Sequence, residues 1–298
     1  MRPLHRPKLV LEVLVLLSLG QVSVQPQSVA RFEKGVLAQA PSTVQPQATG
    51  AGTQDVSQLQ AQLQQAQDKL KDWPDLARYR DANSQVLAPA PEEDRVVFMG
   101  DSITDSWGRK NGKFFPGKPY VNRGISGQTT PQMLIRFRPD VIALRPKVVV
   151  ILAGTNDIAG NTGPTTLEAI EGNLTSMAEL ARANGVRVVL ASLLPVCDYI
   201  RPQTQRRPTE KIVAVNAWMK DYAAKNGFIY LDYYSAMLDD KKMFKQELTY
   251  DGLHPNDAGY EVMAPLAEKA IVAALHGASP AAPGKSLTKE HHKPAKRF

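Results

Sequence analysis

The chain has 298 residues, of which 43% are hydrophobic and 22% charged, and a net charge of +7. This length allows one or two domains, and the composition is ordinary for a soluble globular protein. The basic excess lies at the two ends, because residues 1–24 sum to +2 and residues 276–298 to +4, which leaves +1 for residues 25–275. A nearly neutral body gives no support to nucleic-acid binding, so we expect no nucleic-acid partner.

Residues 1–24 follow the order of segments found in a secretory signal peptide. Basic residues precede the apolar stretch Leu9–Gly20, and Val22–Val24 offers a small-residue processing site. The stretch is shorter than the roughly 20 apolar residues that span a bilayer. Glu12 interrupts it, so an uncleaved N-terminal anchor is the alternative. We expect a secreted or periplasmic protein with no other membrane-crossing segment.

Residues 25–54 are rich in Gln, Pro, Ala, Ser and Gly, which is typical of a low-complexity linker. Residues 55–94 are predicted to form a helical N-terminal extension. It begins with an apolar stripe at alternating spacings of three and four: Val56, Leu59, Leu63, Ala66, Leu70 and Trp73. The stripe covers fewer than three heptads, which favours a helix packed on its own domain over a coiled-coil oligomer through Val56–Trp73. A second, short helix is predicted over Pro74–Asn83.

Residues 95–275 alternate between strand and helix patterns, which predicts one α/β domain. The predicted strands are Arg95–Met99, Tyr120–Asn122, Lys147–Leu152, Val186–Ser192 and Phe228–Leu231. Three helices are predicted. The first begins after a capping box of Thr165 and Glu168, the second covers Thr209–Asn226 and ends at Gly227, and the third runs from a cap at Asn256 or Asp257 to Leu275. The continuous apolarity of the strands indicates a central five-stranded parallel sheet with helices on both faces. Ligands bind such sheets at the carboxyl ends of the strands.

Three residues of the body have the chemistry of a nucleophilic triad. Ser102 directly follows the first predicted strand, and His254 is the only histidine within residues 95–275. A serine nucleophile needs a base that works near neutral pH, and imidazole is the usual one. Asp251 can accept the other ring N–H of His254 and orient the ring. Taken singly, Ser102 would be a helix cap, and the other two would be loop residues.

Two further residues could stabilise negative charge on a substrate oxygen. Gly127 allows close backbone approach and offers its N–H, and the Asn156 amide can donate a hydrogen bond. Taken singly, each is an ordinary turn residue. Because every one of these elements lies in a loop after a strand, their joint occurrence by chance is improbable.

The four blocks that carry these residues resemble those of the GDSL, or SGNH, hydrolase superfamily. They are Gly100-Asp-Ser-Ile-Thr, Ser126-Gly-Gln-Thr, Gly154-Thr-Asn-Asp and Asp251-Gly-Leu-His-Pro-Asn, and the resemblance covers Arg95–Leu275. It implies a three-layer α/β/α, flavodoxin-like fold with Ser102 as nucleophile, His254 as base and Asp251 as its orienting partner. It also implies an oxyanion hole made by the N–H groups of Ser102 and Gly127 and the side chain of Asn156. The segment through Trp107 is most similar to the platelet-activating-factor-acetylhydrolase-like and sugar-acetylesterase-like branch.

The expected function is serine-dependent hydrolysis of short acyl esters, acetyl esters above all, of a sugar or another alcohol through an acyl-enzyme on Ser102. The alternatives are a lysophospholipase or thioesterase with a longer acyl pocket, and a non-catalytic carbohydrate-binding protein of the same fold. We expect no cofactor and no metal, because the body offers a single histidine.

Two segments near the end of the body and of the chain remain. The polar segment Asp198–Pro208, with Arg201, Arg206 and Arg207, either borders the cleft or is a solvated loop. Residues 276–298 are dominated by Pro, Gly, Lys and Ser, which predicts a basic disordered tail.

Overall fold

The structure is a computed structural model that describes residues 51–277. The predictions made for the leader, for nearly all of the 25–54 linker and for the tail beyond residue 277 lie outside these residues. The chain divides into two units, Met1–Thr53 and Gln54–Phe298. The second contains the sheet and the candidate site.

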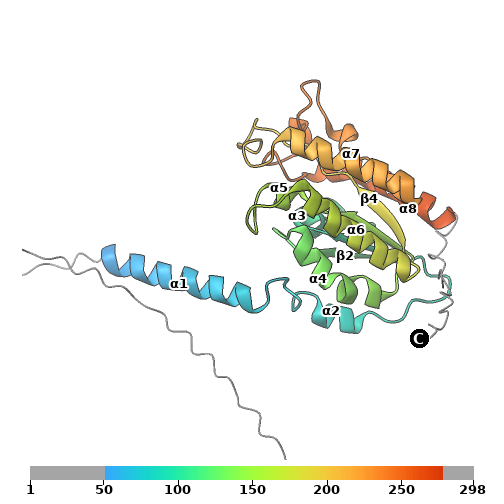
Figure 1. Cartoon of the computed structure of the whole chain (residues 1–298), viewed down its shortest axis with the longest axis horizontal. Helices are drawn as coiled ribbons and strands as arrows, with labels where there is room; N and C mark the ends of the chain where they lie inside the picture. The colour runs from blue at the N-terminus through green and yellow to red at the C-terminus, as the bar shows by residue number, and fades with distance from the viewer. Residues whose placement is uncertain (1–50, 278–298) are drawn as a thin grey trace, which may run out of the picture. The chain divides into compact units, whose positions relative to one another are not determined.

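A five-stranded parallel sheet forms the centre of the domain, with the strand order β2-β1-β3-β4-β5 (Figure 1). The strands are β1 Val96–Gly100, β2 Tyr120–Gly124, β3 Val148–Leu152, β4 Arg187–Ala191 and β5 Ile229–Leu231. Every residue of β1 and β3 is buried, as their continuous apolarity predicts for strands covered on both faces. From β1 the strand order proceeds to β2 on one side, and β3, β4 and β5 follow on the other side of β1. Ligands bind doubly wound sheets at such a reversal of strand order.

Helices cover both faces of the sheet, so the predicted α/β fold is confirmed. They are α1 Ala51–Lys71, α2 Arg80–Gln85, α3 Ser102–Ser106, α4 Thr130–Asp140, α5 Thr155–Ile158, α6 Leu167–Ala183, α7 Thr209–Asn226 and α8 Asp257–His276, with short 3₁₀ turns at Ile142–Leu144, Ser235–Met237 and Gln246–Leu248. The helices α4, α6 and α7 lie side by side on one face (Figure 1). On the other face α8 packs beside α3, where the Tyr260 hydroxyl donates to the carbonyl of Ile103 at 2.7 Å.

Several helix ends follow from the sequence. The side chain of Asn256 accepts the N–H of Gly259 at the start of α8, as predicted. Gly227 closes α7 with a φ of 70°, a left-handed conformation that glycine adopts without steric cost. The helix α6 is capped by Thr166 rather than by Thr165, because the Thr166 side chain accepts the N–H of Ala169.

The prediction for the N-terminal extension is wrong in two respects. The second helix begins at Arg80 rather than at Pro74, because Asp75 has a φ of 55°, which a right-handed helix cannot accommodate. The apolar stripe of α1 does not pack along its own domain over Val56–Leu70, where its large side chains are 53–75% exposed. Between residues 51 and 277 no helix combines the length and apolarity that a membrane span requires.

Candidate active site

The structure brings the three predicted triad residues together from distant parts of the chain. Ser102 is the first residue of α3, directly after β1, and His254 lies in the loop before α8. The Ser102 Oγ lies 2.9 Å from His254 Nε2 across 152 positions of sequence, and His254 Nδ1 lies 2.7 Å from Asp251 Oδ2. The side chains of His254 and Asp251 are 20% and 14% exposed, so the pair is sheltered but open to a ligand.

The loop that carries His254 is fixed by hydrogen bonds. The other carboxylate oxygen of Asp251, Oδ1, accepts the backbone N–H groups of Leu253 and His254 at 3.0 and 2.8 Å. The Thr249 hydroxyl donates to the carbonyl of His254 at 2.7 Å. The Tyr250 ring stacks on the imidazole at 5.6 Å and 9° between planes. These contacts hold the ring in one orientation.

Asp251 is ionised in the folded protein at neutral pH. Burial opposes its ionisation, but the hydrogen bonds from the His254 ring and from backbone N–H groups outweigh burial and lower the pKa of Asp251 to about 2. A carboxylate beside Nδ1 favours the tautomer with the proton on Nδ1. The unprotonated Nε2 then faces the Ser102 hydroxyl, which is the arrangement that a base requires.

The three predicted oxyanion donors follow three neighbouring strands, because Ser102 follows β1, Gly127 follows β2 and Asn156 follows β3. At the first position of α3 the Ser102 N–H has no acceptor within the helix. Gly127 has a φ of 82°, and within residues 51–277 its N–H has no hydrogen-bond acceptor. Asn156 Nδ2 donates one hydrogen to the carbonyl of Gln128 at 3.0 Å, which leaves its second hydrogen for a ligand.

Ser102 is not the helix cap that it would be if taken alone, since Asp101 caps α3 by accepting the N–H of Ile103 at 3.0 Å. Burial raises the pKa of Asp101 to about 6, against the opposing effects of that hydrogen bond and of the charges of His254 and Arg207. The Ser102 hydroxyl is thereby left for His254.

Part of the polar segment Asp198–Pro208 belongs to the site. Arg207 is buried, and its guanidinium donates to Asn156 Oδ1 at 3.4 Å and to Gln203 Oε1 at 3.1 Å. The Gln203 amide in turn donates to the carbonyl of Asp251 at 3.2 Å. The solvated-loop interpretation is therefore wrong for Arg207, which links an oxyanion donor to the triad loop.

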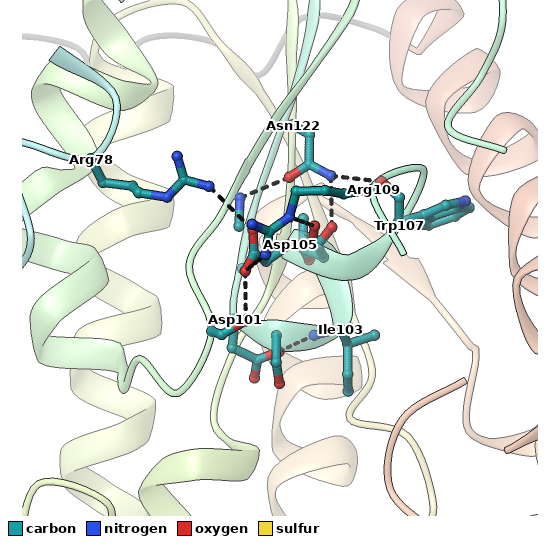
Figure 2. A network of polar contacts seen from close by, with 12 residues as sticks. Arg78, Asp101, Ile103, Asp105, Trp107, Arg109 and Asn122 are labelled. Carbon is teal, nitrogen blue, oxygen red and sulfur yellow. Dashed lines mark hydrogen bonds and ion pairs between the residues drawn. The ribbon is translucent and has the colours of Figure 1, made fainter. Parts of the chain in front are cut away.

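Asp105 is a site residue that the sequence reasoning missed. It is buried one helical turn after Ser102, and it accepts hydrogen bonds from Arg109 and, at 2.5 Å, from the Ser126 hydroxyl. Figure 2 shows the side chains of Arg78 and Arg109 directed at this carboxylate; Arg78 Nη2 lies 3.7 Å from it. Because Ser126 precedes Gly127, Asp105 connects α3, the helix that begins with Ser102, to the loop that carries Gly127. We refer to this loop as the oxyanion loop, after the predicted role of Gly127. The carboxylate three residues after the nucleophile was the available signal.

Among residues 51–277 no group of three or more His, Cys, Asp or Glu side chains is arranged to hold a metal ion. The polar groups at the site are a hydroxyl, an imidazole, a carboxylate and N–H donors. These are the components of acyl transfer through a serine ester.

Comparisons with known proteins agree with this geometry. The model of the GDSL-like lipase/acylhydrolase family matches residues 98–262. A solved structure from Bacteroides fragilis is 44% identical, with a TM-score of 0.64, and the match covers 67% of this chain and 97% of that chain. A GDSL-like lipase from Bacteroides thetaiotaomicron is 42% identical at the same TM-score and covers 67% of this chain and 98% of its own.

Two curated relatives are acetylxylan esterases. That of Xylanibacter ruminicola is 27% identical over 220 residues, which are 61% of this chain but 44% of the relative's length. This chain therefore spans less than half of that protein. The acetylxylan esterase of Geobacillus stearothermophilus is 26% identical over 203 residues, which are 57% of this chain and 90% of that protein.

Proposed function

This chain belongs to the GDSL-like lipase/acylhydrolase family, a family of ester-hydrolysing enzymes, and from that premise we propose that it hydrolyses short acyl esters of a sugar, acetyl esters above all, through an acyl-enzyme on Ser102. The observation that carries the proposal is the continuous chain of contacts from Ser102 through His254 to Asp251. The acetyl group and the sugar are supported by the two acetylxylan esterase relatives.

In the first half of the reaction, His254 Nε2 takes the proton of the Ser102 hydroxyl as Oγ attacks the ester carbonyl. Asp251, ionised because its pKa is about 2, stabilises the imidazolium that forms. The carbonyl oxygen becomes negatively charged and is stabilised by the N–H groups of Ser102 and Gly127 and the amide of Asn156. His254 then protonates the leaving alkoxide, and the sugar hydroxyl departs.

In the second half, water replaces the alcohol. His254 accepts a proton from water as the water oxygen attacks the acyl carbon on Ser102, and the same donors stabilise the second oxyanion. Returning the proton to Ser102 Oγ releases the carboxylic acid. No step needs a cofactor or a metal.

Replacing the nucleophile tests the proposal. Ser102→Ala is expected to abolish hydrolysis of p-nitrophenyl acetate and covalent labelling by a fluorophosphonate, because both require the Oγ atom. Circular dichroism should match that of the parent protein, since Asp101 rather than Ser102 caps the helix. Persistent labelling of the variant would defeat the assignment. Esters of acetate, butyrate and octanoate test the acyl length, and a preference for octanoate would contradict the short-acyl proposal.

We also propose that the protein is exported. The support is the order of basic, apolar and small residues over 1–24. A relative of 33% identity over 81 residues is a Bacillus subtilis lipoprotein. Fractionation of producing cells, followed by N-terminal sequencing of the protein, tests export and cleavage separately.

A further inference from the structure

A cavity of about 920 Å³ lies beside Gly127, at one end of the candidate active site. Its volume is within the roughly 300–1,000 Å³ that is typical of small-molecule sites. One wall consists of the loop Ile125–Gln128 and Asn161, and the other of the segment that links α1 to α2. We refer to this segment, residues 72–79, as the strap.

The strap is fixed to the oxyanion loop by backbone groups. The side chains of Gln128 and Gln132 donate to the carbonyls of Pro74 and Trp73, each at 2.7 Å. The buried Tyr79 hydroxyl donates to the carbonyl of Gly124. These bonds position the wall without using the side chain of Trp73.

Trp73 and Asp75 both line the cavity. Trp73 is 37% exposed, so part of its side chain is accessible. Asp75 has a left-handed backbone, with a φ of 55°, and within residues 51–277 its carboxylate makes no hydrogen bond. Strained backbone that presents an unpaired polar side chain is typical of ligand sites.

The opposite wall supplies polar groups of complementary kind. Asn161 donates to the carbonyl of Gly127 at 3.1 Å, and Arg206 donates to Asn161 Oδ1 at 3.0 Å. Both residues therefore present polar edges directly beside an oxyanion donor. A ring face together with a carboxylate, an amide and a guanidinium suits a sugar, whose C–H face packs on an aromatic ring and whose hydroxyls bond polar groups. A long acyl chain would offer no hydrogen-bond donor to the Asp75 carboxylate.

We infer that this cavity is a subsite for the sugar residues next to the acylated one, with Trp73 as the packing surface and Asp75 as a hydroxyl acceptor. The inference rests on the proposed function, since it places the alcohol side of the ester on the Gly127 side of the site. On this inference the strap contributes to substrate specificity, although it lies outside the domain of residues 95–275.

The test compares two substrates, acetylated xylo-oligosaccharide and p-nitrophenyl acetate, whose alcohol moiety is too small to reach the strap. For Trp73→Ala, the ratio of kcat/KM on the oligosaccharide to kcat/KM on p-nitrophenyl acetate is expected to fall about tenfold, the size of a lost aromatic contact. Leu76→Ala is the matched control, because Leu76 lies in the strap, is 39% exposed and does not line the cavity. Its ratio should stay at the parent value.

A second readout is independent of hydrolysis. Ser102→Ala is titrated with unmodified xylotetraose and followed by tryptophan fluorescence, and Trp73→Phe in the same background should lose most of the signal. An unchanged ratio for Trp73→Ala, or equal losses on both substrates, would overturn the subsite and leave the esterase proposal standing. A parent protein inactive on p-nitrophenyl acetate would refute the esterase proposal instead, and the titration would then decide the subsite. Absence of a xylotetraose signal also counts against the subsite.

Discussion

At the scale of single residues, Asn156 has two functions that can be separated. Its Nδ2 keeps one hydrogen for the proposed oxyanion, and its Oδ1 accepts from the buried Arg207. Asn156→Ala is expected to lower kcat by about 10²–10³, because one oxyanion donor is lost. It should also lower the free energy of unfolding by about 1–3 kcal/mol, because Arg207 and the Gln128 carbonyl lose a partner.

Measuring kcat of Asn156→Ala checks the first effect, and its urea denaturation checks the second, each relative to the parent protein. Asn173→Ala is a suitable control, since it also removes a part-buried asparagine that donates to a single group, the Thr130 hydroxyl, at 3.0 Å. Its kcat should stay near the parent value. Equal losses of kcat in the two variants would mean that Asn156 acts on structure alone.

Asp251 gives the protein a pH-dependent term in its stability. Its folded pKa of about 2 lies below its ordinary value of 3.8, so its ionisation stabilises the fold above pH 4 and this contribution is lost as the pH falls towards 2. At neutral pH the contribution is roughly 2 kcal/mol, and at pH 3 roughly half of that. Asp251→Asn should therefore be less stable than the parent protein at pH 7, with a smaller difference at pH 3.

Urea denaturation at the two pH values measures this difference. Asp101 acts in the opposite direction, because its pKa of about 6 reduces stability as the pH rises from 4 to 6. It is present in both proteins, so its contribution cancels in the comparison. A difference that is the same at pH 7 and pH 3 would show that the Asp251 charge does not stabilise the fold.

The sequence identified the residues at the centre of the site because each carries distinctive chemistry. A lone body histidine, an aspartate three residues before it and a serine after a strand restrict the choice to one triad, and the structure places these side chains in contact. The supporting residues Asp105 and Arg207 escaped this reasoning. Their roles depend on which loops meet in space, and no local pattern marks a buried charge whose partners are distant in sequence.

At the scale of elements, the oxyanion loop is positioned by α3 and by the strap. Ser126→Ala removes the hydroxyl that donates to Asp105 at 2.5 Å. We expect kcat on p-nitrophenyl acetate to fall about tenfold, with KM changed less, because a small displacement of the Gly127 N–H weakens a contact made in the transition state. Ser84→Ala, which removes an exposed bond to the Asp81 carbonyl, is the control. A Ser126 variant with parental kcat would show that Asp105 has no positioning role.

The strands and the helices α6, α7 and α8 were predicted, because period and apolarity mark them directly, whereas α4 was not predicted. The prediction of α7 as Thr209–Asn226 is confirmed to the residue, since Gly227 gives a strong end signal. The strap was not predictable. Pro74 suits a helix start, and only the tertiary hydrogen bonds to Gln128 and Gln132 select the irregular backbone with Asp75 in the left-handed region. The surroundings of α1 were not predictable either, because the periodicity of its sequence does not show what its apolar stripe contacts.

At the scale of the whole molecule, the N-terminal extension is hydrogen-bonded to the domain through residues 73–79. A variant that lacks residues 1–50 and 278–298 is expected to keep the parental Tm and esterase activity. Removing residues 51–83 as well should lower the free energy of unfolding by about 3 kcal/mol or more, since it eliminates several hydrogen bonds and the burial of Tyr79. Activity should fall with it, because the oxyanion loop loses its support. Thermal unfolding and p-nitrophenyl acetate kinetics on both variants check this, and equal Tm values would contradict it.

The distance in sequence between Ser102 and His254 has a consequence for biosynthesis. The ribosome synthesises Ser102 directly after β1, and His254 only after all five strands have been translated. A nascent polypeptide that ends before residue 254 thus carries the Ser102 hydroxyl without its proposed base. On the proposed mechanism, hydrolysis therefore becomes possible only after the segment that carries His254 has been synthesised.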